Sequence, residues 1–167
     1  MAIHATGRVE WAIARLTAWA KGLSLTGSPS VSRADGPARS AEMGPWVRLT
    51  FDEAARAPMG RFSATQTAVE IRLLMVADVF WPETPSEASP DLYGDLRAAS
   101  ELADAMQHLD LTFLDYTTPA TPLTVSDCSI KVLRVEPVRR LPPDAGFKRR
   151  QVRCFPRWVA RFDDFNA

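Results

Sequence analysis

The chain begins with apolar residues at a helical spacing. Within residues 5–21, ATGRVEWAIARLTAWAK, one stripe has apolar positions at steps of three or four: Val9, Ile13, Leu16 and Ala20. Gly22 follows directly and predicts the end of this helix. Residues 22–45 have no regular spacing of apolar residues, so we expect a long surface loop there, with a short strand near Val31.

Two segments with the period of a strand come next. WVRLTF, residues 46–51, alternates apolar and polar positions, as a half-buried strand does. Residues 67–81 place a longer apolar set on a single face: Val69, Ile71, Leu73, Met75, Ala77 and Val79. The other face turns apolar toward Phe80, which predicts a central strand covered on both sides near its end. The polar segment 52–66 between them predicts a wide hairpin loop.

A proline-rich corner, ETPSEASPDLYGDL at residues 83–96, follows the second strand. Ser89 is suited to cap a helix, Pro90 to occupy its first position and Asp91 to face the positive end of its dipole. The next apolar positions are spaced for a helix of about five turns that covers the sheet: Leu92, Leu96, Ala99, Ala103 and Met106. The corner is therefore expected to orient a helix onto a sheet.

The rest of the chain predicts a loop and a second hairpin. Residues 111–127 read as a loop with strand character at its start. Residues 129–140 and 148–162 are rich in β-branched and aromatic side chains, and the turn between them contains Gly146. Two prolines lack the N–H that a ladder needs and are expected at edges, bulges or strand ends: Pro137 and Pro156.

The order helix, strand, strand, helix, strand, strand predicts an α+β fold. We expect a four-stranded, mainly antiparallel sheet with two helices packed on one face, plus long assembly loops. Residues 1–167 are expected to form a single domain, with long loops at 22–45 and 52–66 and a flexible tail at 163–167. A chain of 167 residues can bury a sufficient core without a metal or a disulfide.

Composition excludes several classes of protein. Twenty basic and twenty acidic residues leave no net charge, so no field of the whole protein attracts nucleic acid or membrane. The longest apolar run, LLMVA at 73–77, is far shorter than a membrane span, and the N-terminus lacks the apolar core of a signal peptide. We therefore expect cytoplasmic folding. In that compartment Cys128 and Cys154 are expected to be reduced structural thiols, with a bridge between neighbouring strands as the alternative.

Candidate chemistry is sparse. The two histidines, His4 and His108, have no partner at metal-ligand spacing, and no nucleophile motif or phosphate-binding glycine pattern is present. Glu70 and Asp78 are separated by about 26 Å along an extended strand, too far for an acid and base pair. The adjacent Asp163 and Asp164 fall in the expected tail, where a raised pKa from burial is not expected. The sequence predicts a protein that is not an enzyme, with no cofactor, no metal and no catalytic residue.

Charge is distributed unevenly along the chain. Residues 81–116 contain eight acids and one base, whereas residues 131–161 contain ten bases and two acids. Three interpretations remain open at this point. The two surfaces meet within one monomer or are simply solvated, they face each other across a repeated subunit contact that closes into a ring, or the basic hairpin binds nucleic acid.

The order of these elements resembles the tail terminator proteins of long-tailed, siphovirus-type bacteriophages, of the lambda kind. The resemblance runs from about Trp46 to Phe155 and rests on VFWPETPSEASPDLY at the strand-to-helix corner and VRRLPPDAGF at the final turn. It implies a ring, a homohexamer, that caps the tail tube, terminates tube polymerisation and joins the tail to the head. The implied partners are the tail tube protein and the head-completion or connector protein of the neck, with phage DNA passing through the lumen without specific binding and no membrane contact. The implied location is the tail-neck region of the virion, after assembly in the host cytoplasm.

We expect the loops and the basic hairpin to contact neighbouring subunits or the tube. The candidate contact residues are Arg56, Met59, Arg61, Phe62, Arg139, Arg140, Phe147, Lys148, Arg149, Arg150, Glu83, Glu87, Asp91 and Asp95. Charge reversal at Arg149 and Arg150 is expected to weaken assembly and to leave thermal unfolding nearly unchanged. The alternatives are another neck or tail component, such as a head-closure or tail tube protein, and a small nucleic-acid-binding module that uses the basic C-terminal hairpin.

Overall fold

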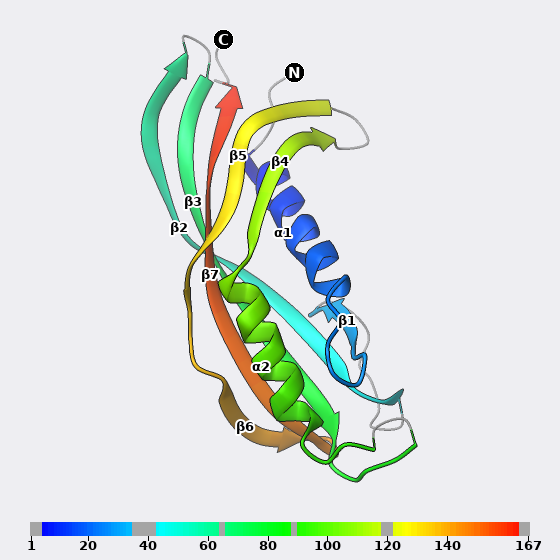
Figure 1. Cartoon of the computed structure of the whole chain (residues 1–167). Helices are drawn as coiled ribbons and strands as arrows, with labels where there is room; N and C mark the ends of the chain where they lie inside the picture. Colours follow the sequence, from blue (N-terminus) through cyan, green and yellow to red (C-terminus); the bar gives the residue numbers. More distant parts are fainter. Residues whose placement is uncertain (1–4, 35–42, 64–65, 88–89, 118–121, 164–167) are drawn as a thin grey trace.

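A computed structural model describes residues 5–34, 43–63, 66–87, 90–117 and 122–163. One mixed sheet runs through these segments, and two helices lie against it (Figure 1). In chain order the elements are α1 (Ala5–Lys21), β1 (Ser30–Arg33), β2 (Trp46–Ser63), β3 (Gln66–Pro82), α2 (Gly94–Gln107), β4 (Asp110–Thr117), β5 (Pro122–Val135), β6 (Arg139–Asp144) and β7 (Phe147–Asp163).

The prediction of a four-stranded sheet is wrong, because the sheet has seven strands. They lie in the order β1-β2-β3-β7-β5-β4, with β6 also paired to β7, and the β1–β2 pair is parallel while the others are antiparallel. The three extra strands are β1, β4 and β6. β4 comes from residues 111–117, which were expected to be a loop, and β6 begins at the end of the expected strand 129–140 and continues into the expected turn. Two expected strands are also longer than expected, because residues 52–63 continue β2 and residues 122–127 belong to β5.

The long β2–β3 pairing persists through residues that usually end a strand. Register shifts between Glu53 and Ala55, between Pro58 and Gly60 and between Arg61 and Ser63 show where the ladder takes up irregular residues. Gly60 has a φ of +105°, a conformation that side chains disfavour. The pairing of β2 with a long regular partner therefore outweighs the weak strand propensity of this segment.

The predicted central strand is confirmed. β3 lies between β2 and β7, and its odd-numbered residues from Ile71 to Trp81 are all almost fully buried. The buried residues of both helices belong to the same core cluster as this face of β3: Ala12, Ile13, Leu16 and Ala20 of α1, and Ala98, Ala99, Leu102 and Met106 of α2. Both helices therefore cover one face of the sheet, which we call the helix face, and leave the other, the open face, without a helix.

Several boundaries match the pattern of the sequence and others do not. The first helix spans the expected residues 5–21, and β1 forms the short strand expected near Val31. α2 begins at Gly94, four residues after the expected start at Pro90; the expected cap, Ser89, lies outside the described residues. Of the expected tail, Asp163 ends β7 and pairs with Gln66, and residues 164–167 lie outside the described residues.

The two prolines of the second hairpin meet the expectation in different ways, Pro137 at strand ends and Pro156 at a register shift in the pairing of β5 with β7. Pro137 lies between β5 and β6, two segments that both pair with β7, so it sits at strand ends as expected. Pro156 instead lies inside β7, a central strand, where it pairs with Val132 of β5. The β3–β7 ladder has no residue pair between Arg72–Arg157 and Met75–Cys154, and this gap includes Pro156. The missing N–H of the proline falls where that ladder is already interrupted.

Candidate assembly surfaces

The proline-rich corner is built around Trp81 at the end of β3. The Trp81 indole N–H donates to the backbone oxygen of Asp91 at 2.8 Å, and the Asp91 carboxylate accepts from the backbone N–H of Tyr93 at 2.9 Å. Trp81 is 1% exposed, and Gly27 and Gly94 flank its ring so closely that a Cβ on either glycine would clash with it. The corner therefore fixes the start of α2 over the sheet through one aromatic side chain.

Two basic residues of β7 meet the start of α2 within the monomer. Lys148 and Arg150 pair with Trp81 and Val79 in register and so project from the helix face. The Lys148 ammonium donates to the backbone oxygen of Leu92 at 2.6 Å, and Arg150 Nε donates to the Asp95 carboxylate at 2.8 Å. Asp95 is 3% exposed. Part of the acidic helix and part of the basic hairpin thus pair inside one chain. These contacts agree with the first of the three interpretations, in which the two charged surfaces meet within one monomer.

A second buried carboxylate, Asp78, organises the open face. Arg48 of β2 and Arg149 of β7 each place Nη2 3.1 Å from Asp78 Oδ2, and the Gln151 amide donates to Asp78 Oδ1 at 2.9 Å. Asp78 is 3% exposed, while the two arginine side chains remain 31% and 25% exposed. The Nε atoms of both arginines are buried without a hydrogen-bond partner, so the carboxylate is the main compensation for two partly buried positive charges.

An aromatic cluster supports these arginines. The rings of Trp46 and Phe80 stack at a centroid distance of 4.5 Å, and Phe147 meets Phe80 edge to face at 6.0 Å. The guanidinium carbons of Arg48 and Arg149 lie 5.1 and 5.5 Å from the Phe80 centroid. This part of the open face is packed by its own residues.

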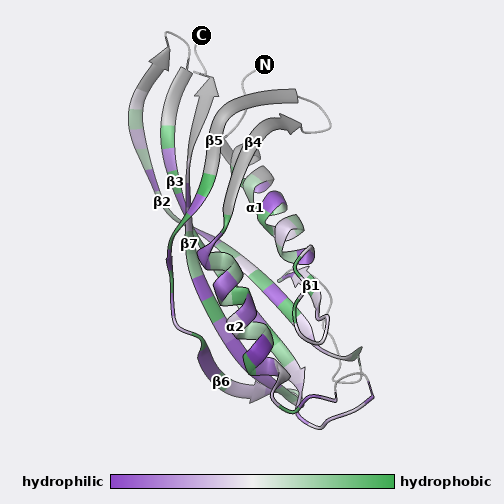
Figure 2. Ribbon diagram, viewed as in Figure 1, coloured by the Kyte–Doolittle hydropathy of each residue, from purple (hydrophilic) through white to green (hydrophobic). Residues whose placement is uncertain are grey.

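The remainder of the open face is rich in arginine. Strand register and side-chain contacts place eight basic and five acidic described residues on this face. The basic residues are Arg48, Arg72, Lys131, Arg134, Arg139, Arg149, Arg153 and Arg157, and the acidic residues are Asp52, Glu70, Asp78, Glu136 and Asp144. A chain with no net charge therefore presents one basic surface, and Figure 2 shows the hydrophilic colouring along β6 and β7.

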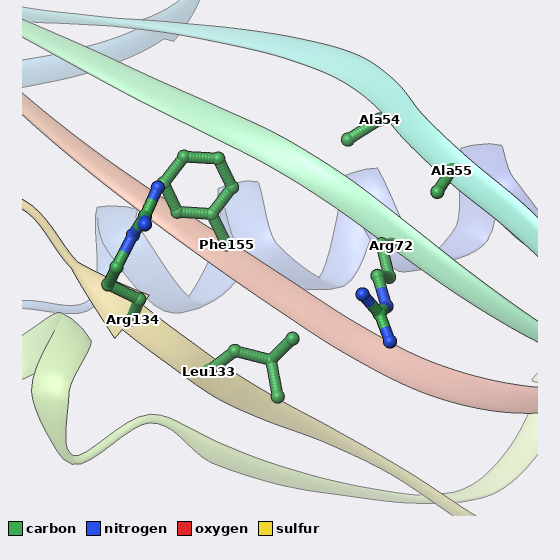
Figure 3. Close-up of a pocket in the computed structure, with 6 residues that line it drawn as sticks. All are labelled: Ala54, Ala55, Arg72, Leu133, Arg134 and Phe155. Carbon is green, nitrogen blue, oxygen red and sulfur yellow. The ribbon is translucent and has the colours of Figure 1, made fainter.

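A shallow groove with a cavity volume of about 360 Å³ lies on this face, between β2 and β5. Its lining residues come from four strands (Figure 3): Ala54 and Ala55 of β2, Arg72 of β3, Leu133 and Arg134 of β5, and Phe155 of β7. The Arg134 guanidinium lies 4.4 Å from the Phe155 centroid, and Leu133 is 47% exposed. The groove combines an apolar floor with two exposed guanidinium groups.

The residues that lead into α2 and the first turn of this helix present a different surface, which we call the α2 patch. It consists of three large side chains that remain exposed: Leu92 at 43%, Tyr93 at 65% and Leu96 at 44%. Glu83 and Glu87 of the corner are exposed before this patch, and Asp104 is exposed two turns further along the helix surface. Two basic groups also border this patch, because Arg97, 63% exposed, follows Leu96 and the Lys148 ammonium contacts the Leu92 oxygen. The α2 patch is thus apolar with more acidic than basic neighbours, on the side of the sheet opposite to the groove.

The outer edge of β2 is a third candidate surface for contacts with other chains. β1 pairs only with Trp46 to Leu49, and beyond Leu49 no described strand pairs with this edge of β2, whose other edge pairs with β3. Every residue from Asp52 to Gly60 is exposed, so both faces of this segment lack a cover, and Met59 is 57% exposed. We call residues 52–60 the β2 extension.

The candidate contact residues are distributed over these surfaces. Arg56 and Met59 lie on the β2 extension, and the side chains of Arg61 and Phe62 lie outside the described residues. Arg139 and Arg149 lie on the open face and Phe147 is buried beneath it, whereas Lys148, Arg150, Asp91 and Asp95 form the contacts around α2. Glu83, Glu87 and Arg140 are exposed. The structure brings Arg150 together with Asp95 but does not gather the whole set into one site.

Three features of these surfaces were missed. The Asp78 centre has partners 30 and 71 residues away, and nothing local in the sequence indicates them. The groove depends on Leu133 and Arg134 at an irregularity in the pairing of β5 with β7, which period-two patterns do not reveal. The α2 patch was missed because Leu92 and Leu96 were expected in the stripe that covers the sheet; they are exposed, and the buried side of α2 instead includes Ala98 and Leu102.

Chemical groups for catalysis are not gathered in the part of the chain that the structure describes. There, no cluster of three or more His, Cys, Asp or Glu side chains is placed to hold a metal ion. His108 follows α2, and its backbone N–H donates to the oxygen of Ala105; His4 lies outside the described residues.

Burial raises the pKa of the Cys154 thiol to about 12, and Cys154 is free. The Cys128 side chain is outside the described residues. None of the helices described has the length and apolar character needed to cross a bilayer.

Comparison with known proteins gives little guidance. No family model and no curated protein matches this chain. One chain of known structure is similar over 98% of this chain and 97% of its own length, at 16% sequence identity and a TM-score of 0.38. A likeness at that level carries no argument about function.

Proposed function

We propose that the chain is a structural, non-enzymatic virion subunit of the tail terminator kind. In this proposal, copies of the chain form a ring, about six by the resemblance described above, that caps the tail tube, ends its polymerisation and joins the tail to the head. The ring would be assembled in the host cytoplasm and would end in the tail-neck region of the virion. Its partners would be its own copies, the tube protein and a connector protein of the neck.

The observation that carries the proposal is the β2 extension. A segment with two uncovered faces and an unpaired edge contributes nothing to the core of the monomer, and such an edge readily accepts another chain. Its bulges, Pro58 and charged side chains oppose indiscriminate edge pairing, as expected of a surface that must remain soluble until its partner arrives. This combination suits a subunit whose contact forms on assembly.

Mass measurement and imaging test the proposal. The purified chain is examined by native mass spectrometry and negative-stain electron microscopy at increasing protein concentration, and we expect a closed ring. Arg56→Glu and Met59→Glu on the β2 extension should reduce ring formation, whereas Arg15→Glu on the exposed side of α1 should not. A chain that remains monomeric at millimolar concentration would overturn the proposal.

The alternatives lead to different results. Another neck or tail component, such as a head-closure or tube protein, would form a ring that stacks into tubes or requires a different neighbour. The basic open face favours nucleic-acid binding as a second candidate. Four of the five basic residues named for the C-terminal hairpin already contact oxygens of the same chain, namely Arg139, Lys148, Arg149 and Arg150. DNA affinity that falls steeply with salt would favour that second function.

A further inference from the structure

The groove on the open face and the α2 patch have complementary chemistry. The groove has an apolar floor formed by Leu133 and Phe155 and two guanidinium groups, Arg72 and Arg134, whose side chains are 50% and 64% exposed. Each guanidinium already pairs with one carboxylate of its own chain, Arg72 with Glu70 at 2.7 Å and Arg134 with Glu136 at 3.4 Å, and its exposed part remains available to a second partner. The α2 patch has three exposed apolar side chains next to exposed carboxylates. We propose that the α2 patch of one copy of this chain docks into the groove of the next copy. This inference rests on the proposed ring and names the surfaces that form its subunit contact.

The location of the two surfaces decides the type of contact. α2 covers the helix face of the sheet, and the groove opens on the opposite face. A contact between different surfaces of identical chains is heterologous, and each copy retains a free groove and a free patch until the assembly closes. An arrangement of this type generates a ring when the rotation between copies closes, so the proposed geometry leads to the proposed assembly.

The groove is large enough to accept side chains of another copy. Its volume of about 360 Å³ would hold about a dozen water molecules at about 30 Å³ each. Displacing that water with Tyr93 and Leu96 would remove apolar surface from solvent on both copies, and this is the main favourable term in association. Each of the three apolar side chains of the patch is at least 43% exposed in the monomer, so the patch has surface left to bury.

Electrostatics favours a second copy over nucleic acid as the occupant. The open face carries more basic than acidic described residues, whereas the corner that leads into the α2 patch carries the exposed carboxylates Glu83 and Glu87. Opposite charges at two surfaces speed encounter and fix orientation. A nucleic acid would match the guanidinium groups but would leave the exposed leucines of the α2 patch uncovered.

A complementation experiment tests this contact. Leu133→Asp blocks the groove and Leu96→Asp blocks the patch; both positions are largely exposed, and thermal unfolding of each variant confirms that it folds. Each variant alone should be monomeric by sedimentation velocity under conditions where the natural sequence forms rings. Mixed in equal amounts, the two should form one-to-one heterodimers, because one copy still has an intact patch and the other an intact groove. Arg134→Glu and Tyr93→Ser provide a second pair if either aspartate variant fails to fold.

Each outcome has a definite meaning. Heterodimers in the mixture, with neither variant self-associating, support the heterologous contact. Rings formed by either variant alone, or a mixture that stays monomeric, overturn it while the ring itself still stands for the natural sequence. A natural sequence that never forms rings removes the proposed function as well, and salt-dependent DNA binding lost in Arg134→Glu would assign the groove to nucleic acid.

Discussion

The indole ring of Trp81 occupies the space into which a side chain on Gly94 would project. Gly94 is the first residue of α2, and Trp81 ends the buried face of β3. This contact joins strand and helix layers at one point, and the indole N–H adds a hydrogen bond to the backbone of Asp91. The proline-rich corner therefore needs a glycine at this position because of packing, and no chemical role is required to explain it.

Gly94→Ala should destabilise the fold. Alanine normally favours a helix by up to about 1 kcal/mol over glycine, so propensity alone would predict a gain. The new Cβ would instead meet the Trp81 ring, and overpacking of this kind costs about 1–3 kcal/mol. Chemical denaturation measures the free energy of unfolding. Gly22→Ala is the matched control, since its Cβ would meet no atom closer than 3.4 Å, and an equal loss in both variants would contradict the role of Trp81.

Patterns along the sequence predicted the elements whose burial repeats regularly. The odd positions of β3 and the stripe of α1 face the core at every period, so local spacing is enough to identify them. The β2 extension could not be predicted in this way, because residues 52–60 are exposed on both faces and carry no alternation. Only the long partner β3 makes them a strand.

Long-range pairing explains most of what was missed elsewhere. Residues 111–127 were expected to be a loop, yet β5 begins at Pro122, a position where a strand tolerates proline. Asp78 follows a long apolar run, and its partners Arg48 and Arg149 are brought to it by two neighbouring strands. The basic hairpin was recognised from composition, but its division between two faces of β7 depends on register: Arg149 faces the open side and Arg150 faces α2.

Removal of the Asp78 charge should lower the free energy of unfolding substantially, although the substitution changes few atoms. Asp78→Asn would leave Arg48 and Arg149 close together, with two buried Nε atoms that already lack partners. Loss of one member of a buried ion pair costs about 3–5 kcal/mol, and we expect about 3 kcal/mol here because both arginines keep some solvent contact. Denaturant unfolding measures the change.

The control for Asp78 is a surface ion pair in the same sheet. Glu53→Gln removes the partner of Arg56, a pair 2.7 Å long whose side chains are 36% and 37% exposed. Such pairs contribute about 0–1 kcal/mol, so this variant should unfold almost as the natural sequence does. Similar losses for Asp78→Asn and Glu53→Gln would contradict a special role for the buried carboxylate.

Charge reversal should affect the stability of the fold differently at Arg150 and at its cross-strand neighbour Arg140. Arg150→Glu would place a second carboxylate against the buried Asp95, so we expect a clear loss of stability, and the same holds for Arg149 beside Asp78. This replaces the expectation of nearly unchanged unfolding for these two positions. Arg140 is exposed, so Arg140→Glu should change the free energy of unfolding by less than about 0.5 kcal/mol. Comparable stability of Arg150→Glu and Arg140→Glu in thermal denaturation would show that the Asp95 pair contributes little.

The buried thiol of Cys154 gives the fold a defined response to alkaline pH. Burial raises the pKa of the thiol from 9.0 to about 12, so the folded chain holds this proton more tightly than the unfolded chain. Its contribution to stability is complete below pH 9 and is lost as pH rises from 9 toward 12. The loss approaches about 1.4 kcal/mol per pH unit for one group in that range.

Comparison with a variant isolates this response from other alkaline titrations. Cys154→Ala removes the thiol and also leaves a small cavity, so it should be less stable than the natural sequence at neutral pH. Above pH 9 the difference in free energy of unfolding between the two chains should shrink as the unfolded thiol ionises. A difference that stays constant from neutral pH to pH 11 would mean that the folded thiol ionises as readily as the unfolded one, and that Cys154 is not held in the apolar core as described.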